Sequence, residues 1–332
     1  MTAIPQYTET GTARRVGVEI EFIGLDVVSS AELVRATYGG TIKAVTDYDI
    51  RVETPELGEF RIELDFALLK NMGAERAQAS EEPSLISQVS EEILAALAQQ
   101  VTPCEIVSSP IPFSAVMQLD RLVETLHQAG AQGTDDGLLY AFGVHFNPEI
   151  PALDADTILR YLRAFVLLYD WLKAQLQVDL SRRITPYINP FPAAYIRLLL
   201  NPAYRPERDD LIRDYLHHNP TRNRALDMLP LFAELAPQLV TAAVNDPLVK
   251  PRPTFHYRLS NCRVGDPHWL LSTEWAYWLL LEQLAQQPQR LTELAQDYLI
   301  LDRQPLQPLS SSWAQHMTQW LPRHGLWPQR NP

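Results

Sequence analysis

The stretch Arg15-Val16-Gly17-Val18-Glu19-Ile20-Glu21-Phe22 alternates apolar and polar side chains. Successive side chains of a β-strand point to opposite faces of the sheet. The pattern therefore predicts a strand with one apolar face and a second face that carries Glu19 and Glu21. Two carboxylates on one face of a strand repel each other, so they need a cation or a basic partner nearby. The stretch indicates both an element of a sheet core and a candidate site.

Later segments divide their side chains between two faces in the same way. They are Arg61-Ile62-Glu63-Leu64-Asp65-Phe66, Gly143-Val144-His145-Phe146-Asn147 and Phe255-His256-Tyr257-Arg258-Leu259, and Glu105 begins a further short strand. A solvent-facing sheet also has one polar face. Such a face favours Thr, Lys and Ser, whereas these carry Glu, Asp, His, Asn and Arg. Several carboxylates beside one histidine suit Mg²⁺ or Mn²⁺. Zinc is disfavoured because no set of cysteines has the required spacing.

The order of elements predicts an α+β protein. Strand patterns prevail in residues 14–150 and helical patterns in residues 151–300, and we expect one domain over 14–300. We expect residues 1–13 to be a flexible arm and residues 301–332 a loosely packed tail. Apolar spacing predicts a strand over 41–54 that pairs with 59–66, a helix over 29–37 capped by Ser29 or Ser30, and further helices over 84–101, 113–129, 154–176, 269–287 and 291–299.

Composition and missing motifs exclude several classes of protein. The 332 residues carry a net charge of −12, which argues against nucleic acid or an anionic membrane as a partner. No apolar run reaches the roughly 18 residues that a membrane span needs. Two cysteines in a chain of this length are typical of a cytoplasmic protein with free thiols. The chain has no P-loop, no dinucleotide-binding glycine motif, and no HExxH, GxSxG or CxxC motif.

Three motifs, taken in order, resemble those of a known family. They are the strand over 15–22, Glu105-Ile106-Val107-Ser108-Ser109-Pro110, and Gly143-Val144-His145-Phe146-Asn147. Together they resemble the signatures of the amidoligases, a branch of the glutamine synthetase and glutamate–cysteine ligase superfamily. The resemblance covers residues 14–150 well and residues 150–300 loosely. It implies a curved antiparallel sheet of the glutamine synthetase catalytic type, packed with helices.

The resemblance also implies roles for individual residues. The divalent-metal ligands would be Glu19, Glu21, Glu105, His145 and, by strand order alone, Glu63. His145 would lie beside the metals and the nucleotide phosphates, and Arg258 would match a late arginine that contacts phosphate or substrate. The expected catalytic set is Glu19, Glu21, His145 and Arg258. The expected nucleotide-binding set is His145, Asn147, Arg258 and Arg197, where Arg197 is added because a guanidinium suits phosphoryl oxygens. Asn147 stands where the family commonly has a second histidine, and the family's late Glu-x-Arg signature has no clear counterpart after Leu259.

The implied reaction is the ATP-dependent joining of a carboxylate to an amine through an acyl phosphate, with Mg²⁺ or Mn²⁺ as cofactor. The partners would be small-molecule or peptide substrates, which the sequence does not name, and the oligomeric state stays open. Two alternatives also stay open. The same carboxylates suit a metal-dependent hydrolase of a phosphate or an amide. A non-catalytic interaction protein could use the helix-rich half and the tail tryptophans Trp313, Trp320 and Trp327.

Overall fold

The computed structural model describes residues 4–46, 48–64, 103–134, 142–178, 188–304 and 309–328. Its strands form one open antiparallel sheet in the order β2-β3-β4-β5-β1-β7-β9-β8, and β6 pairs with the start of β1. The strands are β1 (Arg15–Phe22), β2 (Thr41–Thr46), β3 (Asp49–Thr54), β4 (Gly58–Leu64), β5 (Cys104–Ser108), β6 (Ile111–Pro112), β7 (Gly143–Pro148), β8 (Leu226–Asp227) and β9 (His256–Asn261). The predicted antiparallel sheet with a helix-rich second half is confirmed.

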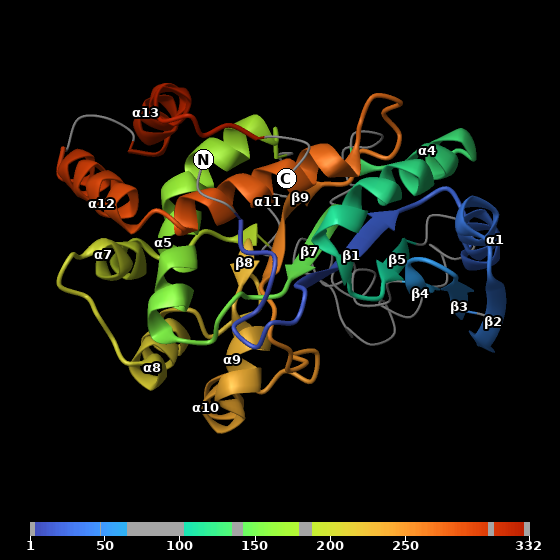
Figure 1. Ribbon diagram of the computed structural model, residues 1–332, viewed down its shortest axis with the longest axis horizontal. Coiled ribbons are helices and arrows are strands. Elements are labelled where there is room, and N and C mark those ends of the chain that lie inside the picture. Colours follow the sequence, from blue (N-terminus) through green and yellow to red (C-terminus); the bar gives the residue numbers. More distant parts are fainter. Residues whose placement is uncertain are drawn as a thin grey trace, which may run out of the picture.

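Helices cover the sheet and extend beyond one end of it. They are α1 (Val27–Tyr38), the 3₁₀ helix η1 (Phe113–Leu119), α4 (Asp120–Gln128), α5 (Ala155–Gln175), α7 (Ala193–Leu200), α8 (Arg208–His218), α9 (Leu229–Leu235), α10 (Pro237–Ala243), α11 (Leu271–Ala285), α12 (Pro288–Asp302) and α13 (Leu309–Arg323). Figure 1 shows α1 beside β2 and β3 at one end of the molecule, and α7, α8, α12 and α13 at the other. Among the described helices, none combines the length and the apolar composition needed to cross a bilayer.

The strand β1 lies inside the sheet because its apolar residues are buried on one face. Val16, Val18, Ile20 and Phe22 are almost fully buried. Ile20 lies opposite Ile106 of β5 on one side and Val144 of β7 on the other. Opposite side chains of an antiparallel pair share a face of the sheet, so these residues form a continuous apolar surface. The polar residues of the same strands are thereby directed to the other face.

The helix α11 packs against this apolar face. The ring of Trp275 lies 5.2 Å from that of Phe146 on β7, and Trp278 lies 5.3 Å from Tyr257 on β9. Phe146 and Tyr257 are partners in the strand register. In Figure 1, α11 crosses the molecule beside the long helix α5, with which it packs. The helical layer therefore holds one face of the sheet, and the candidate site belongs to the opposite face.

The segment predicted as one strand over 41–54 is two strands, β2 and β3, joined by a tight turn. Thr46 lies opposite Asp49 in the register. The hydroxyl of Thr46 accepts a hydrogen bond of 3.2 Å from the backbone N–H of Tyr48. A side chain that bonds its own backbone two residues further on stabilises a turn, and it ends β2 there. The prediction of a single strand was wrong because the alternation of apolar and polar residues does not reveal this local hydrogen bond.

The two ends of α1 depend on particular residues, and the first of them corrects a sequence prediction. The N-cap of α1 is Asp26, whose carboxylate accepts from the backbone N–H of Ser29 at 2.7 Å, so neither Ser29 nor Ser30 is the cap. A carboxylate at this position satisfies an N–H that the helix leaves free. After the helix, Gly40 has φ +102° and lies against the backbone of Glu53. A side chain at Gly40 would collide with that backbone, so glycine is required for the chain to enter β2.

The tail packs more tightly than predicted. The helix α13 lies against α5, and the indole N–H of Trp313 donates a hydrogen bond of 2.7 Å to the backbone carbonyl of Leu167. Trp313 and Met317 are fully buried, and Trp320 is largely buried, whereas Trp327 is 47% exposed. Two of the three tail tryptophans therefore belong to the protein's own core. The helix predicted over 84–101 lies outside the described residues, and the predicted domain limits stay predictions.

Candidate active site

A row of carboxylates crosses three neighbouring strands on the polar face of the sheet. Glu63 of β4 lies opposite Glu105 of β5, and Glu105 lies opposite Glu21 of β1. Glu19 lies two residues before Glu21 on the same face, opposite His145 of β7. Alternation within each strand predicted that these five side chains share a face of one antiparallel sheet. The strand registers confirm this placement.

His145 lies between two of these carboxylates. Its Nδ1 donates a hydrogen bond of 2.8 Å to Oε2 of Glu19, and its Nε2 lies 3.5 Å from Oε1 of Glu21. The other oxygen of Glu21 accepts from the backbone N–H of Gly143 at 2.7 Å. All three side chains are largely buried. The imidazole is therefore held in one orientation by carboxylates at both of its nitrogens.

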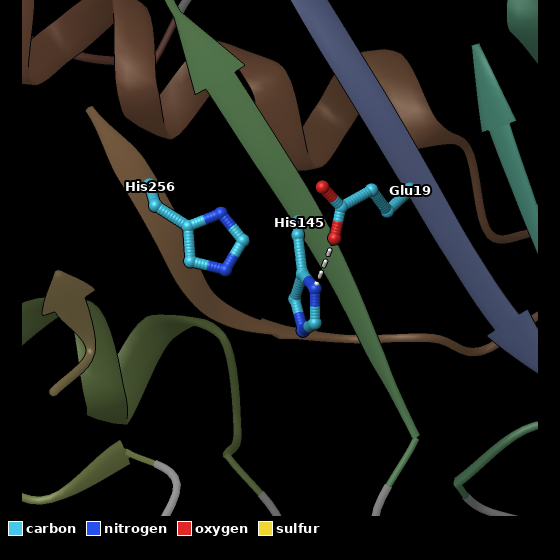
Figure 2. A group of neighbouring side chains, drawn as sticks. All are labelled: Glu19, His145 and His256. Atoms are coloured by element: carbon cyan, nitrogen blue, oxygen red, sulfur yellow. Dashed lines mark hydrogen bonds and ion pairs between the residues drawn. The ribbon is translucent and has the colours of Figure 1, made fainter. Parts of the chain in front are cut away.

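Within the described ranges, two groups of potential metal-ligating atoms share His145. One consists of Glu21, Glu105 and His145, and the other of Glu19, His145 and His256. In each group the potential ligand atoms lie within 4.8 Å of one another. Figure 2 shows the second group: Glu19, His145 and His256 come from β1, β7 and β9, and their polar atoms point towards a common region. His256 stood on a polar strand face in the sequence pattern, but no motif assigned it a role.

Asn147 connects the acidic and basic parts of the site. Its Nδ2 donates to Oε1 of Glu19 at 2.8 Å, and its Oδ1 accepts from Nη2 of Arg252 at 2.8 Å. The same Oδ1 lies 2.6 Å from Nδ1 of His256. Sequence analysis missed Arg252 because it precedes β9, in Lys250-Pro251-Arg252-Pro253. This segment has no strand alternation from which the face of its side chain could be predicted.

The surroundings set the charges of two of these groups. Burial alone would raise the pKa of Glu19, but the hydrogen bond from His145 and the neighbouring basic groups His256 and Arg252 hold it well below its ordinary value. Burial lowers the pKa of His256 well below its ordinary value, and the charge of Arg258 adds to this effect. At neutral pH Glu19 is therefore ionised.

A buried arginine faces the carboxylates from the next strand. Burial lowers the pKa of Arg258, and the negative charges of Asp227, Glu19 and Glu21 raise it. Its Nη2 lies 4.0 Å from Oδ2 of Asp227. Burial raises the pKa of Asp227 to about 6, although Arg258 opposes this shift. Sequence analysis missed Asp227 because its strand, β8, has two residues, too few for any periodicity.

Two predicted site residues have other partners. Glu63 shares the polar face, but its Oε2 lies 2.7 Å from Nη2 of Arg61, and it belongs to neither group of potential ligands. Arg197 lies on α7, where its Nε is 2.7 Å from Oδ2 of Asp302 on α12. Figure 1 places α7 beyond α5, away from β1 and β7. The structure thus does not bring Arg197 to the site, because α7 packs on α5 and α12 rather than on the sheet.

Comparison with known proteins identifies the family. A family model described as "putative amidoligase enzyme" matches residues 12–280. The chain is therefore a member of this amidoligase family, as its three motifs predicted, and this membership supports a ligase class of enzyme. No curated protein and no solved structure matches the chain.

Proposed function

We propose that the protein is an ATP-dependent ligase that joins a carboxylate to an amine through an acyl phosphate, on a sheet of the glutamine synthetase type. One observation carries the proposal. The carboxylates of Glu19, Glu21 and Glu105 gather around His145 on one face of the sheet, and Arg258 lies within electrostatic reach of them. Family membership supports the same class of reaction.

The donor set fits a divalent cation. Carboxylate oxygens with one imidazole suit Mg²⁺ and Mn²⁺, and Glu21, Glu105 and His145 already lie close enough to share one. Glu63 could join them only by releasing Arg61. When bound, the cation would neutralise negative charge on the phosphates of ATP.

The basic residues would act on the transferred phosphoryl group. Arg258 on β9 is almost fully buried, and Arg252, which precedes β9, is partly buried beside Asn147. A guanidinium donates two parallel hydrogen bonds to phosphoryl oxygens, and these are strongest where water is excluded. Because the amide of Asn147 is committed to Glu19 and Arg252, we propose that Asn147 positions these two groups. It would not make the predicted contact with the nucleotide.

The chemistry proceeds in two balanced steps. A carboxylate oxygen of the substrate forms a bond to the γ-phosphorus of ATP while the bond to the β-phosphate oxygen breaks, so ADP leaves. The amine then forms a C–N bond to the acyl carbon, inorganic phosphate leaves, and a carboxylate of the site accepts the amine proton. The first step is needed because a free carboxylate is a poor electrophile.

The proposal is tested by the substrate dependence of ADP release. We expect ADP release to require a carboxylate as well as ATP and Mg²⁺. Without the amine this release should be slow, and adding the amine should raise it to steady turnover. Hydroxylamine should trap the activated carboxylate as a hydroxamate. Cleavage of a substrate with metal and without ATP would replace the ligase by the metal-dependent hydrolase. ADP release that no carboxylate stimulates would also contradict the proposal.

Divalent cations should stabilise the folded protein. We expect millimolar Mg²⁺ or Mn²⁺ to raise the Tm, because a ligand that binds only the folded state stabilises it by mass action. Glu21→Gln should remove most of this rise, while the metal-free variant remains at least as stable as the metal-free wild type, since one repelling charge is gone. Glu32→Gln is the matched control, because Glu32 is half-exposed on α1. A wild-type Tm that does not change with millimolar Mg²⁺ or Mn²⁺ would contradict the proposed metal site.

A further inference from the structure

A pocket lies between α9, α10 and the segment 244–251, which leads to Arg252 and β9. Its volume is about 160 Å³. Figure 1 places α9 and α10 at the bottom of the view, below β8. Most of the walls are aliphatic side chains or prolines, among them Ala233, Pro237, Val240, Val244, Val249 and Pro251. An apolar cavity of about 150 Å³ holds a molecule the size of benzene, so this pocket has room for an aliphatic side chain.

Two residues of the candidate active site hold the walls of this pocket. The carboxylate of Asp227 accepts a hydrogen bond of 2.9 Å from the backbone N–H of Leu229, at the start of α9. The backbone N–H of Arg252 donates one of 3.1 Å to the carbonyl of Pro230 on the same helix, and its guanidinium contacts Asn147. The pocket therefore adjoins the site, and the same segments of chain build both.

An ion pair lies at the edge of the pocket. Asp246 lines the pocket, and its Oδ2 is 3.6 Å from Nη1 of Arg222, which is longer than a hydrogen bond. The other oxygen of Asp246 accepts from the backbone N–H of Leu248 at 2.9 Å, so the carboxylate is held in place. Arg222 also acts electrostatically on Asp227 and Arg258. It therefore faces the site as well as the pocket.

These features match the parts of one kind of molecule. An α-amino acid carries an ammonium and a carboxylate close together, which suit a carboxylate and a guanidinium that face each other without a hydrogen bond. An aliphatic side chain suits the apolar walls. We infer that the carboxylate substrate is an α-amino acid with a short aliphatic side chain. The side chain lies in the pocket, Asp246 binds the ammonium, and Arg222 binds the carboxylate.

This orientation determines which group of the amino acid reacts. Arg222 is the member of the ion pair that acts on Arg258, so the α-carboxylate faces the proposed position of the phosphoryl group. An ammonium has only donors, so the nitrogen held by Asp246 is no nucleophile. The α-carboxylate is therefore the group that is phosphorylated in the first step, and a second substrate supplies the amine. A glutamate side chain is disfavoured, because its charge would be desolvated against the apolar walls.

The inference rests on the proposed function for the reaction, but binding of the amino acid can be measured without ATP. In calorimetric titrations we expect L-leucine to bind at least about 10-fold more tightly than glycine, because burial of its side chain contributes that much. Leucinamide and 4-methylpentanoate each lack one of the two charges and should bind about 10-fold more weakly than L-leucine. If L-leucine binds no more tightly than glycine, the inference is wrong.

Two variants test the pocket and the ion pair separately. Thr241 is exposed on α10 and lines the pocket, so Thr241→Leu should fill it and weaken L-leucine binding by at least about 10-fold. Thr241→Ser is the matched control and should bind L-leucine as the wild type does. Arg222→Gln should weaken binding by about 10-fold or more, whereas Arg213→Gln, in an exposed ion pair on α8, should not. Unchanged affinity in Thr241→Leu and Arg222→Gln would overturn the inference.

The reaction provides a test on the wild type. With ATP, Mg²⁺ and hydroxylamine, L-leucine should stimulate ADP release and form leucine hydroxamate, and L-glutamate should do neither. If a different carboxylate stimulates ADP release and L-leucine does not, only this inference falls. If no carboxylate stimulates ADP release, the proposed function falls, and the role of the pocket in the reaction falls with it.

Discussion

Glu19→Gln should lower kcat for carboxylate-dependent ADP release by about 100-fold or more, the usual cost of removing one preorganised charged or hydrogen-bonding group from an active site. Glu19 accepts hydrogen bonds from His145 and Asn147. Its negative charge would matter most while the phosphoryl group moves. The KM for the carboxylate should change little, because a loss confined to the transition state appears in kcat rather than in KM.

Steady-state kinetics of Glu19→Gln, measured as ADP released against carboxylate concentration, decide this prediction. Glu32→Gln on the surface of α1 is the matched control and should behave as the wild type. Circular dichroism and the Tm of the metal-free variant establish that Glu19→Gln is folded. A folded Glu19→Gln with wild-type kcat would remove Glu19 from the reaction, and a change in KM alone would reduce its role to substrate binding.

Glu282→Gln should lower the free energy of unfolding by about 3–5 kcal/mol, which is the usual cost of breaking a fully buried ion pair. Arg14 and Glu282 are completely buried, with Nη2 and Oε1 2.7 Å apart. Tyr161 and Trp278 donate further hydrogen bonds to the same carboxylate. The neutral amide leaves the charge of Arg14 without its partner, and burial makes that charge expensive.

Urea denaturation of the wild type and of Glu282→Gln measures this loss. Glu32→Gln breaks a half-exposed ion pair with Arg35 and should cost less than about 1 kcal/mol, because solvent screens such pairs. Replacing both Arg14 and Glu282 by apolar residues should restore part of the stability, since no charge is then left unpaired. Equal losses in the buried and exposed pairs would contradict the expected cost of leaving the buried charge of Arg14 without its partner.

Much of the site was predictable because alternation in a strand is a strong local signal. The pattern Val18-Glu19-Ile20-Glu21-Phe22 determined which side chains share a face, and the structure places them so. Alternation does not determine which strands are neighbours, since β1 pairs with β5 and β7 from distant parts of the chain. Arg252 and Asp227 were missed for a different reason: neither lies in a segment long enough or regular enough to show strand alternation.

The errors have equally local causes. Arg197 was predicted to hold phosphoryl oxygens because a guanidinium suits them, but its helix packs on α5 and α12 and it pairs with Asp302. The tail was expected to be loose because of its Pro and Gln content. In the structure, Trp313 and Met317 bury enough apolar surface to hold α13 on α5. The amino-acid composition of a segment does not reveal whether its few large apolar side chains are buried against the rest of the protein.

The central claim is the acyl phosphate, and transfer of ¹⁸O from the carboxylate tests it most directly. The carboxylate found by ADP release is labelled with ¹⁸O, turned over with ATP, Mg²⁺ and the amine, and the inorganic phosphate is analysed by mass spectrometry. If the carboxylate attacks the γ-phosphorus, each amide formed releases one phosphate that carries one labelled oxygen. Phosphate whose new oxygen comes only from water would contradict the account.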